Sequence, residues 1–289
     1  MVQGDPALEA RPRSPAARRA SVAAVFDRVA AEYDQLSVAW FSPMARELVR
    51  LLEPMPGERA IDIGCGRGAV MFELAAALGA GGRVQGIDLS QKMIEHARRD
   101  PRNGQAGSAP IELQVMDAAT PTLPEACLDL ATASFVLFFL PAPVPALRAW
   151  RRLLAPGGRL GVTTFAAHRG GWLSAALAPY LPPGRADGAQ LPSPFDSDAG
   201  VEGLLSTAGF GRIRTVTIEL ALEFNGVAQW YAWSLSHGQR AVWERIAEAD
   251  RPRAVASAAD ELQRWRRCDG TIALTERVRC TIGHRPMTT

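Results

Sequence analysis

Short apolar runs alternate with stretches of helical periodicity through the middle of the chain. Compact apolar runs bounded by turn residues predict buried strands at 60–63, 83–88, 111–116, 128–134 and 159–165. Apolar residues spaced three and four apart predict helices at 69–78, 91–99 and 144–154. Strands that alternate with helices of about ten residues form a parallel sheet covered on both faces.

The flanking regions follow other patterns. Helical spacing predicts helices over 21–33 and 44–52, before the first strand. The glycine- and proline-rich stretch 166–200 has no clear period and is expected to leave the domain as an excursion. A helix at 199–208 and a strand at 213–224 follow it. The aromatic helical stretch 225–270 then forms a second excursion before a last strand at 271–282, and both excursions can lie over one edge of the sheet.

We place this α/β domain at residues 21–289. Composition limits the class of protein and the compartment that are expected for it. Residues 1–20 combine prolines with alanine and arginine and are expected to be a disordered tail. No apolar run is long enough to span a membrane, and a net charge of +2 is too small for a dedicated nucleic-acid binder. Four scattered cysteines, without a CxxC pair, indicate a reducing cytoplasm and no metal site.

A glycine-rich turn, Gly64-Cys65-Gly66-Arg67-Gly68-Ala69, follows the first predicted strand. It satisfies the GxGxxG/A pattern of dinucleotide-binding proteins, and Asp88 ends the next strand about twenty residues later. An acidic group at that place accepts hydrogen bonds from both hydroxyls of a ribose. The loop alone therefore leaves open a dinucleotide or S-adenosylmethionine (SAM).

Three further features favour SAM. Asp62 lies two residues before the first glycine, where it repels a pyrophosphate but attracts an ammonium group. Asp117 and Ala118 end the third strand, where a carboxylate and a backbone N–H can bind an adenine edge. A short-chain dehydrogenase needs a tyrosine with a lysine four residues later, and none of the three tyrosines has one.

In these motifs the chain resembles the class I SAM-dependent methyltransferases. The matching segments are 60–68, 86–90, 116–118 and 153–158, and the resemblance covers about residues 22–165 and the final strand. It implies a Rossmann-like fold with a seven-stranded, mostly parallel sheet, an antiparallel last strand, helices on both faces and helical cap insertions. The residues expected to bind SAM, or S-adenosylhomocysteine (SAH) as product, are Tyr33, Asp62, Gly64, Gly66, Asp88, Leu89, Met93, Asp117, Ala118 and Ser134.

The segment 25–34 also resembles the N-terminal signature of the ubiquinone and menaquinone C-methyltransferase branch. The resemblance implies that Tyr33 closes over the methionine end of SAM, and that the strands at 213–224 and 271–282 form a hairpin with an unusually long insertion. Residues 134–139 depart from that branch, which has an arginine and an asparagine there, and this argues against a quinone head group. The two excursions are the expected substrate cap.

Methyl transfer from a sulfonium is an in-line displacement that depends on alignment, and an oxygen acceptor also benefits from a general base. The candidate bases are His168, just past the fifth strand, and His237 in the second excursion. Aromatic residues indicate an apolar acceptor, with Phe138 and Phe139 as further candidates; the expected pocket residues are Phe26, Phe135, Trp172, Trp230 and Trp233. The segment after the fourth strand lacks the residues of a metal-dependent catechol enzyme or a DNA methyltransferase.

Alternatives stay open at this point. The leading hypothesis is methylation of a carbon, oxygen or nitrogen of a hydrophobic small molecule, in secondary metabolism, by a monomer or homodimer. A protein of this fold can instead bind SAM and catalyse a cyclisation or rearrangement. An NAD(P)-dependent oxidoreductase is the third hypothesis, because the glycine loop alone also fits a dinucleotide.

Overall fold

The computed structural model describes residues 15–33, 38, 40–166, 171–182 and 193–287. The strands are β1 (Arg59–Ile63), β2 (Arg83–Asp88), β3 (Ile111–Val115), β4 (Leu128–Ser134), β5 (Leu154–Phe165), β6 (Gly211–Phe224) and β7 (Ile272–His284). The helices are α1 (Pro15–Val29), α2 (Phe41–Leu52), α3 (Ala69–Leu78), α4 (Gln91–Arg99), α5 (Pro143–Leu153), α6 (Gly171–Leu177), α7 (Asp198–Thr207), α8 (Val227–Leu235), α9 (Arg240–Trp243) and α10 (Arg251–Leu262).

The strands form one sheet in the order β3-β2-β1-β4-β5-β7-β6. Neighbouring strands from β3 to β5 are parallel, and β7 is antiparallel to both β5 and β6. The sheet therefore confirms the predicted fold, a mostly parallel seven-stranded sheet with an antiparallel last strand. In parallel α/β sheets of this kind, ligands bind at the carboxyl ends of the strands.

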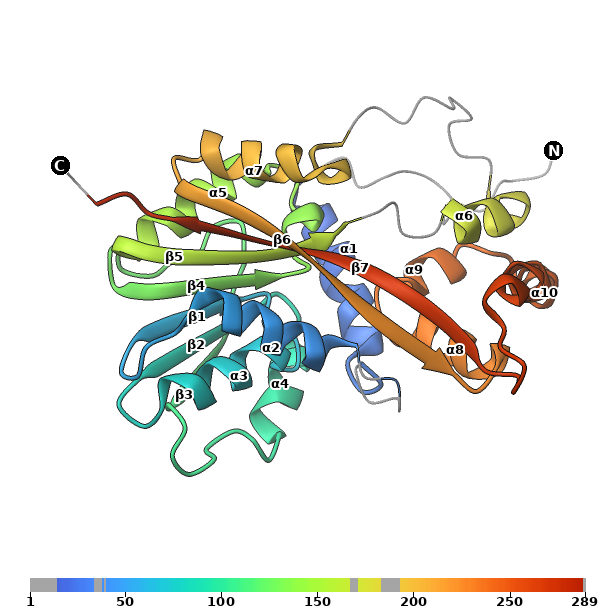
Figure 1. Cartoon of the computed structure of the whole chain (residues 1–289), viewed down its shortest axis with the longest axis horizontal. Coiled ribbons are helices and arrows are strands. Elements are labelled where there is room, and N and C mark those ends of the chain that lie inside the picture. Colours follow the sequence, from blue (N-terminus) through green and yellow to red (C-terminus); the bar gives the residue numbers. More distant parts are fainter. Residues whose placement is uncertain (1–14, 34–37, 39, 167–170, 183–192, 288–289) are drawn as a thin grey trace.

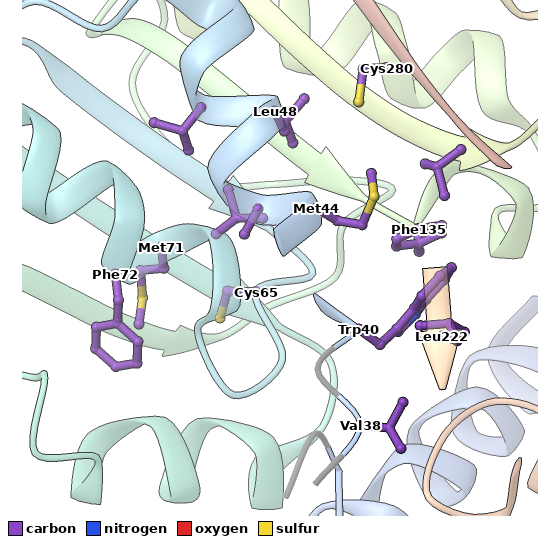
Figure 2. Close-up of a cluster of buried hydrophobic side chains, with 14 of the residues drawn as sticks. Val38, Trp40, Met44, Leu48, Cys65, Met71, Phe72, Phe135, Leu222 and Cys280 are labelled. Carbon is purple, nitrogen blue, oxygen red and sulfur yellow. The ribbon is translucent and has the colours of Figure 1, made fainter. Parts of the chain in front are cut away.

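Two layers of helices bury the two faces of the sheet (Figure 1). α2, α3 and α4 pack on one face, and α5 and α7 on the other, each with its own apolar cluster. Figure 2 shows part of the first cluster, where Met44 and Leu48 of α2 lie between the glycine-loop side and Cys280 of β7. Trp40 continues this cluster toward Phe135 and Leu222, at the edge where the strands end.

The β6–β7 hairpin extends beyond the rest of the sheet. β5 pairs with β7 only as far as Phe165 and Val278, whereas β6 and β7 stay paired as far as Phe224 and Ile272. The helices α8, α9 and α10 lie at this projecting end (Figure 1). The hairpin thus carries the second excursion past the carboxyl ends of the strands.

The two excursions pack on each other. α6, from the first excursion, contacts α10 from the second. The Ser257 hydroxyl donates to the carbonyl oxygen of Ala176 at 3.0 Å. Together α6, α8, α9 and α10 form a helical layer that we call the cap.

Several boundaries differ from the predicted ones. α1 begins at Pro15, six residues before the predicted start. β5 begins at Leu154, because Leu154 pairs with Leu128 of β4 ahead of an irregularity in the register. α6 lies in a stretch without a clear hydrophobic period, and burial of Leu173 and Leu177 against the cap stabilises it. Within the described ranges, no helix has both the length and the apolarity needed to cross a membrane.

Candidate active site

A cavity of about 680 Å³ lies at the carboxyl ends of the parallel strands. The glycine loop after β1, the end of β2 at Asp88, the end of β4 at Ser134 and the end of β5 at Phe165 all line it. α1, the start of α2, the segments after β3 and β4, the turn before α7 and the turn between α8 and α9 contribute further walls. The cavity is therefore shared between the sheet, the first helix and the cap.

The structure brings the ten predicted cofactor residues together. All of them except Asp62 line this cavity. Asp62 lines a smaller cavity of about 130 Å³, which shares Tyr33, Gly64, Gly66 and Ser134 with the larger one. The two cavities therefore meet at the glycine loop.

Gly66 shows why the loop needs glycine. Its φ is +53°, and a Cβ built there would meet no described atom within 4 Å. The missing side chain leaves open space where the two cavities meet, so a ligand can approach the backbone closely. The residues present fit a bound nucleoside with a charged amino-acid tail.

Asp88 supports this loop from the end of β2. Its carboxylate accepts hydrogen bonds from the backbone N–H of Gly66 and of Ser90, both at 2.8 Å. Burial raises the pKa of Asp88, and these two N–H donors oppose that shift. The carboxylate thus ties the glycine loop to the start of α4.

Asp62 is buried on β1, with 1% of its surface exposed. The Thr132 hydroxyl donates to its Oδ1 at 2.8 Å. Burial raises the pKa of Asp62 to about 7, with a smaller contribution from the charge on Asp88. A cation placed in the smaller cavity would favour the ionised form of this carboxyl.

Asp117 and Ala118 form the far end of the cavity. Asp117 Oδ1 accepts from the N–H of Ala119 at 2.8 Å, and Arg19 of α1 lies 3.4 Å from Oδ2. The indole N–H of Trp150 donates to the carbonyl oxygen of Ala118 at 2.7 Å. These contacts fix the segment that follows β3.

α1 covers the cofactor half of the cavity. Asp27 of α1 accepts from the Ser90 hydroxyl at 2.5 Å and from the N–H of Lys92 at 3.2 Å. Arg67 of the glycine loop donates to the carbonyl oxygens of Ala30 and Ala31, at 2.9 and 2.8 Å, just after the helix ends. The glycine loop and α4 are therefore both attached to this helix.

α1 is also joined to the cap. Arg28 forms a two-pronged ion pair with Glu244, with Nη2–Oε2 at 2.7 Å and Nε–Oε1 at 3.3 Å. Arg240 of α9 reaches the same carboxylate at 3.1 Å and lies 3.7 Å from Glu32. One helix thus contacts both the cofactor side and the cap side of the cavity.

Aromatic rings form the rest of the cavity wall. The phenylalanines that line it are Phe26, Phe41, Phe135, Phe138, Phe139, Phe165 and Phe195. Among the described lining residues the only arginine or lysine is Arg19, at the far end beside Asp117. This half of the cavity is apolar and suits an uncharged, hydrophobic ligand.

Phe135 has a backbone conformation that residues other than glycine rarely adopt, with a φ of +57°. The hydroxyl of Thr163 accepts from its N–H at 3.0 Å, which holds the turn. Its ring lies 4.9 Å from Phe165 and 5.9 Å from Trp40, measured between centroids. The turn places this ring in the cavity wall immediately after β4.

His237 lies in the α8–α9 turn and lines the cavity. Its Nδ1 is 2.8 Å from the carbonyl oxygen of Trp233. A carbonyl oxygen only accepts, so Nδ1 carries the hydrogen and Nε2 of the neutral ring is the basic nitrogen. The other predicted base, His168, lies outside the described residues.

Of the five residues predicted for the substrate pocket, Phe26 and Phe135 line the cavity and the three tryptophans do not. Trp230 and Trp233 are buried in the core, with 1% and 4% of their surface exposed. Trp172 packs against Trp230 at 5.7 Å and against Trp265 at 5.4 Å. These indoles pack among the cap helices and the core, and Trp233 lies behind two lining residues, with ring centroids 4.4 Å from His237 and 6.2 Å from Trp40.

Other lining residues were not among the predicted site residues. They include Trp40, Phe165, Phe195 and Gln239. Phe165 ends a parallel strand, and that position at the carboxyl edge is a usable signal. The other three come from loops whose direction no periodicity encodes. Within the described ranges, no group of three or more His, Cys, Asp or Glu side chains could hold a metal ion.

Comparison with known proteins agrees with this geometry. Residues 61–162 match the family described as "Methyltransferase domain". Aklanonic acid methyltransferase DauC from Streptomyces sp. (strain C5) is 42% identical over 56% of this chain and 70% of its own length. Nocamycin O-methyltransferase from Saccharothrix syringae is 34% identical over 81% of this chain and 87% of its own length.

A solved structure shares the fold. A phosphoethanolamine N-methyltransferase of Haemonchus contortus, in complex with phosphomonomethylethanolamine and SAH, aligns with a TM-score of 0.53 at 15% identity, over 86% of this chain and 53% of that one. Both relatives are named methyltransferases, which does not support the nicotinamide alternative. The chain belongs to the class I SAM-dependent methyltransferases, and SAM is its cofactor.

Proposed function

We propose that this enzyme transfers the methyl group of SAM to an oxygen atom of a hydrophobic, aromatic small molecule of secondary metabolism. The observation that carries the proposal is the joining of three features in one cavity. These are the predicted cofactor residues at one end, a wall of phenylalanines at the other, and His237 in the turn between α8 and α9.

The cofactor residues divide into three groups. Asp88 is positioned to accept hydrogen bonds from the ribose, and Asp117 with the Ala118 segment to bind the adenine. Asp62 in the smaller cavity suits the ammonium of the methionine end, beneath Tyr33. When bound, SAM supplies a methyl group activated by a sulfonium, and these residues bind and orient it.

His237 supplies the base that an oxygen acceptor needs. Its neutral Nε2 takes the proton of the acceptor hydroxyl, while the Trp233 carbonyl holds Nδ1–H. With SAM bound, its activated methyl group would pass to the acceptor oxygen, leaving a methyl ether and SAH. The proton of the acceptor hydroxyl would be held on Nε2 of His237 and leave from there.

Two relatives support oxygen as the methylated atom. Nocamycin O-methyltransferase covers most of this chain at 34% identity. Ubiquinone biosynthesis O-methyltransferase from Ralstonia nicotianae is 30% identical over 66% of the chain. The apolar wall supports a hydrophobic acceptor, because the described lining residues offer no cation there to bind an anionic group.

The test is a product analysis with a panel of acceptors. Purified enzyme and SAM are incubated with phenols, naphthols, hydrophobic carboxylic acids, amines and enolisable ketones, and the products are identified by mass and by NMR. We expect a gain of one methyl group on the hydroxyl oxygen of a hydrophobic, uncharged hydroxy compound. Methylation of carbon or nitrogen alone would contradict the proposal, and a rearranged product of unchanged mass would favour the cyclase alternative.

His237→Asn removes the proposed base but keeps the hydrogen bond to the Trp233 carbonyl that holds the side chain. The asparagine amide retains a donor for the Trp233 carbonyl but has no basic nitrogen, so we expect kcat to fall by about 10²- to 10⁴-fold. The affinity for SAM should stay within about twofold, because His237 belongs to the acceptor end. The loss should shrink for an acidic phenol that is already ionised, which needs no base.

Ser236→Ala is the matched control for His237→Asn. The Ser236 hydroxyl also donates to the Trp233 carbonyl, at 2.8 Å, so this variant perturbs the same turn without removing the base. We expect its kcat to stay close to that of the wild type. Equal losses in both variants, or none in His237→Asn, would exclude His237 as the base.

A further inference from the structure

Arg279 is a buried charge in the middle of β7, with 3% of its surface exposed. Its neighbours along the strand, Val278 and Cys280, pack in the apolar cluster under α2. Alternation along the strand directs Arg279 to the opposite face, where Asp198 begins α7. A buried guanidinium loses its hydration and needs a partner for each N–H.

All five N–H groups of Arg279 have acceptors. Nε donates to the Asp198 carboxylate. Nη1 and Nη2 each donate to two backbone carbonyl oxygens: those of Phe165 and Phe195 at 2.9 Å for Nη1, and those of Ala166 at 2.7 Å and Asp196 at 3.2 Å for Nη2. One side chain thus binds five oxygens from two separate segments.

These two segments are the ends of the first excursion. The excursion leaves the sheet at Phe165 and Ala166, at the end of β5. It ends at a short 3-10 turn, Pro194–Asp196, just before α7. Phe165 and Phe195 both line the acceptor half of the cavity. Phe138 lies between them, with ring centroids 5.6 Å from Phe165 and 6.2 Å from Phe195.

We propose that Arg279 is a positioning residue that sets the distance between the Phe165 and Phe195 walls and so determines which acceptors fit. The proposal rests on the proposed function, because it assigns the acceptor to this half of the cavity. A buried ion pair is weak evidence for stability, since apolar residues can fill the same space at no loss. The five hydrogen bonds of Arg279 instead fix how the end of β5 and the turn before α7 lie relative to each other. No strand pairing joins these two segments.

Arg279→Lys tests this positioning role. A lysine ammonium has three donors and cannot bind both segments as the planar guanidinium does. The probe is 1-naphthol, added to enzyme saturated with SAH, with Kd measured by calorimetry. We expect naphthol to bind at least about tenfold more weakly than to the wild type, which corresponds to ~1.4 kcal/mol. The Kd of SAH should stay within about twofold.

Gly200→Ala disturbs the same wall by another route. A Cβ at Gly200 would clash with the carbonyl oxygen of Pro194, so the turn that carries Phe195 must shift while Arg279 is retained. We expect weaker naphthol binding here too, and this variant carries the test if Arg279→Lys does not fold. Arg277→Lys is the control, because Arg277 is a half-exposed arginine on the same strand, paired at 3.1 Å with Glu219.

The outcomes separate positioning from a purely structural role. In Arg279→Lys, hydrogen exchange should quicken at residues 193–198 along with the loss of naphthol affinity. A lower unfolding temperature with unchanged naphthol Kd in both variants would overturn the proposal. If wild-type enzyme binds naphthol but methylates no oxygen in the panel, the proposed function fails, while the Kd ratio still decides the role of Arg279.

Discussion

At the scale of single residues, the carboxyl of Asp62 has the most unusual environment in the site. Burial raises its pKa to about 7, so the apo protein holds it partly protonated near neutral pH. A cationic ligand favours the ionised form and lowers the pKa when it binds. Proton release is therefore linked to the binding of SAM.

We expect the affinity for SAM to rise with pH, by about eightfold between pH 6 and 7.5 if only ionised Asp62 binds, as the carboxyl titrates near pH 7. Asp62→Asn should bind weakly and show no such rise. Calorimetry in two buffers of different ionisation enthalpy measures the released proton. The control is Asp269→Asn, at a fully exposed carboxyl. A wild-type affinity independent of pH would refute the linkage.

The same pKa has a consequence for stability. Folding raises the pKa of Asp62. The contribution of this carboxyl to the free energy of unfolding is therefore fully present below about pH 4 and is lost as pH rises through about 7. Without ligand, Asp62→Asn should therefore unfold at a higher temperature than the wild type at pH 8, with a smaller difference at pH 5. Thermal unfolding at the two pH values checks this, and an equal difference at both would contradict it.

At the scale of elements, α1 connects the two halves of the site. Arg67 and Asp27 attach it to the glycine loop and α4, and Arg28 attaches it to Glu244 of the cap. Because α1 lines the cofactor half of the cavity, we expect SAM to leave only when some of these contacts break. We therefore expect the release of the cofactor to depend on an ion pair that does not touch it.

Arg28→Ala should raise the dissociation rate constant of SAH by up to about fivefold, because a half-exposed pair contributes at most about 1 kcal/mol. The effect should vanish at about 1 M salt, where screening is nearly complete. Stopped-flow displacement measures the rate. Arg50→Ala, which removes an exposed pair with Glu47 on α2, is the control. Equal rates at low salt would mean that α1 opens without breaking this pair.

How far the elements could be predicted depends on what stabilises each one. The predicted bounds of α3, β2, α4 and β4 are those of the structure, because their apolar periods match the face that they bury. Several of the predicted cofactor residues follow from spacing, since Asp88 and Ser134 end strands and Gly64 and Leu89 directly follow them, whereas Tyr33 follows α1 and Met93 lies in α4. α6 and the turn Pro194–Asp196 depend on contacts distant in sequence, including Arg279, and no local period encodes them.

At the scale of the whole molecule, tryptophans form the centre of the cap, in the same apolar cluster that lies under α2. Trp230 lies in it between Trp172 and Trp243, at 5.7 and 6.1 Å. The tryptophans were predicted to face the substrate because they are aromatic. The residue type alone does not say which side of a helix is buried. The rings that do line the cavity come from strand ends and loops, from α1 and from the start of α2.

Trp230→Ala should destabilise the cap by about 3–5 kcal/mol, because it opens a large void among packed rings. Acceptor binding should fall at least about tenfold. The affinity for SAH should fall by no more than about fivefold, the loss expected if the Arg28 pair breaks. Hydrogen exchange over 225–271 and calorimetry with SAH and 1-naphthol check this, with Trp230→Phe as the conservative variant. Equal loss of both ligands would show that cap and cofactor site unfold together.

The hairpin that carries the cap bears on how such an enzyme can diversify. The register of β6 and β7 is set by pairs that run from Gly211 and His284 to Phe224 and Ile272, and β5 pins β7 from its other side. The register is thus fixed without the segment inserted at the tip, residues 225–271. Evolution can therefore exchange the segment that carries His237 as a module, while the sheet and the residues at its strand ends are inherited intact.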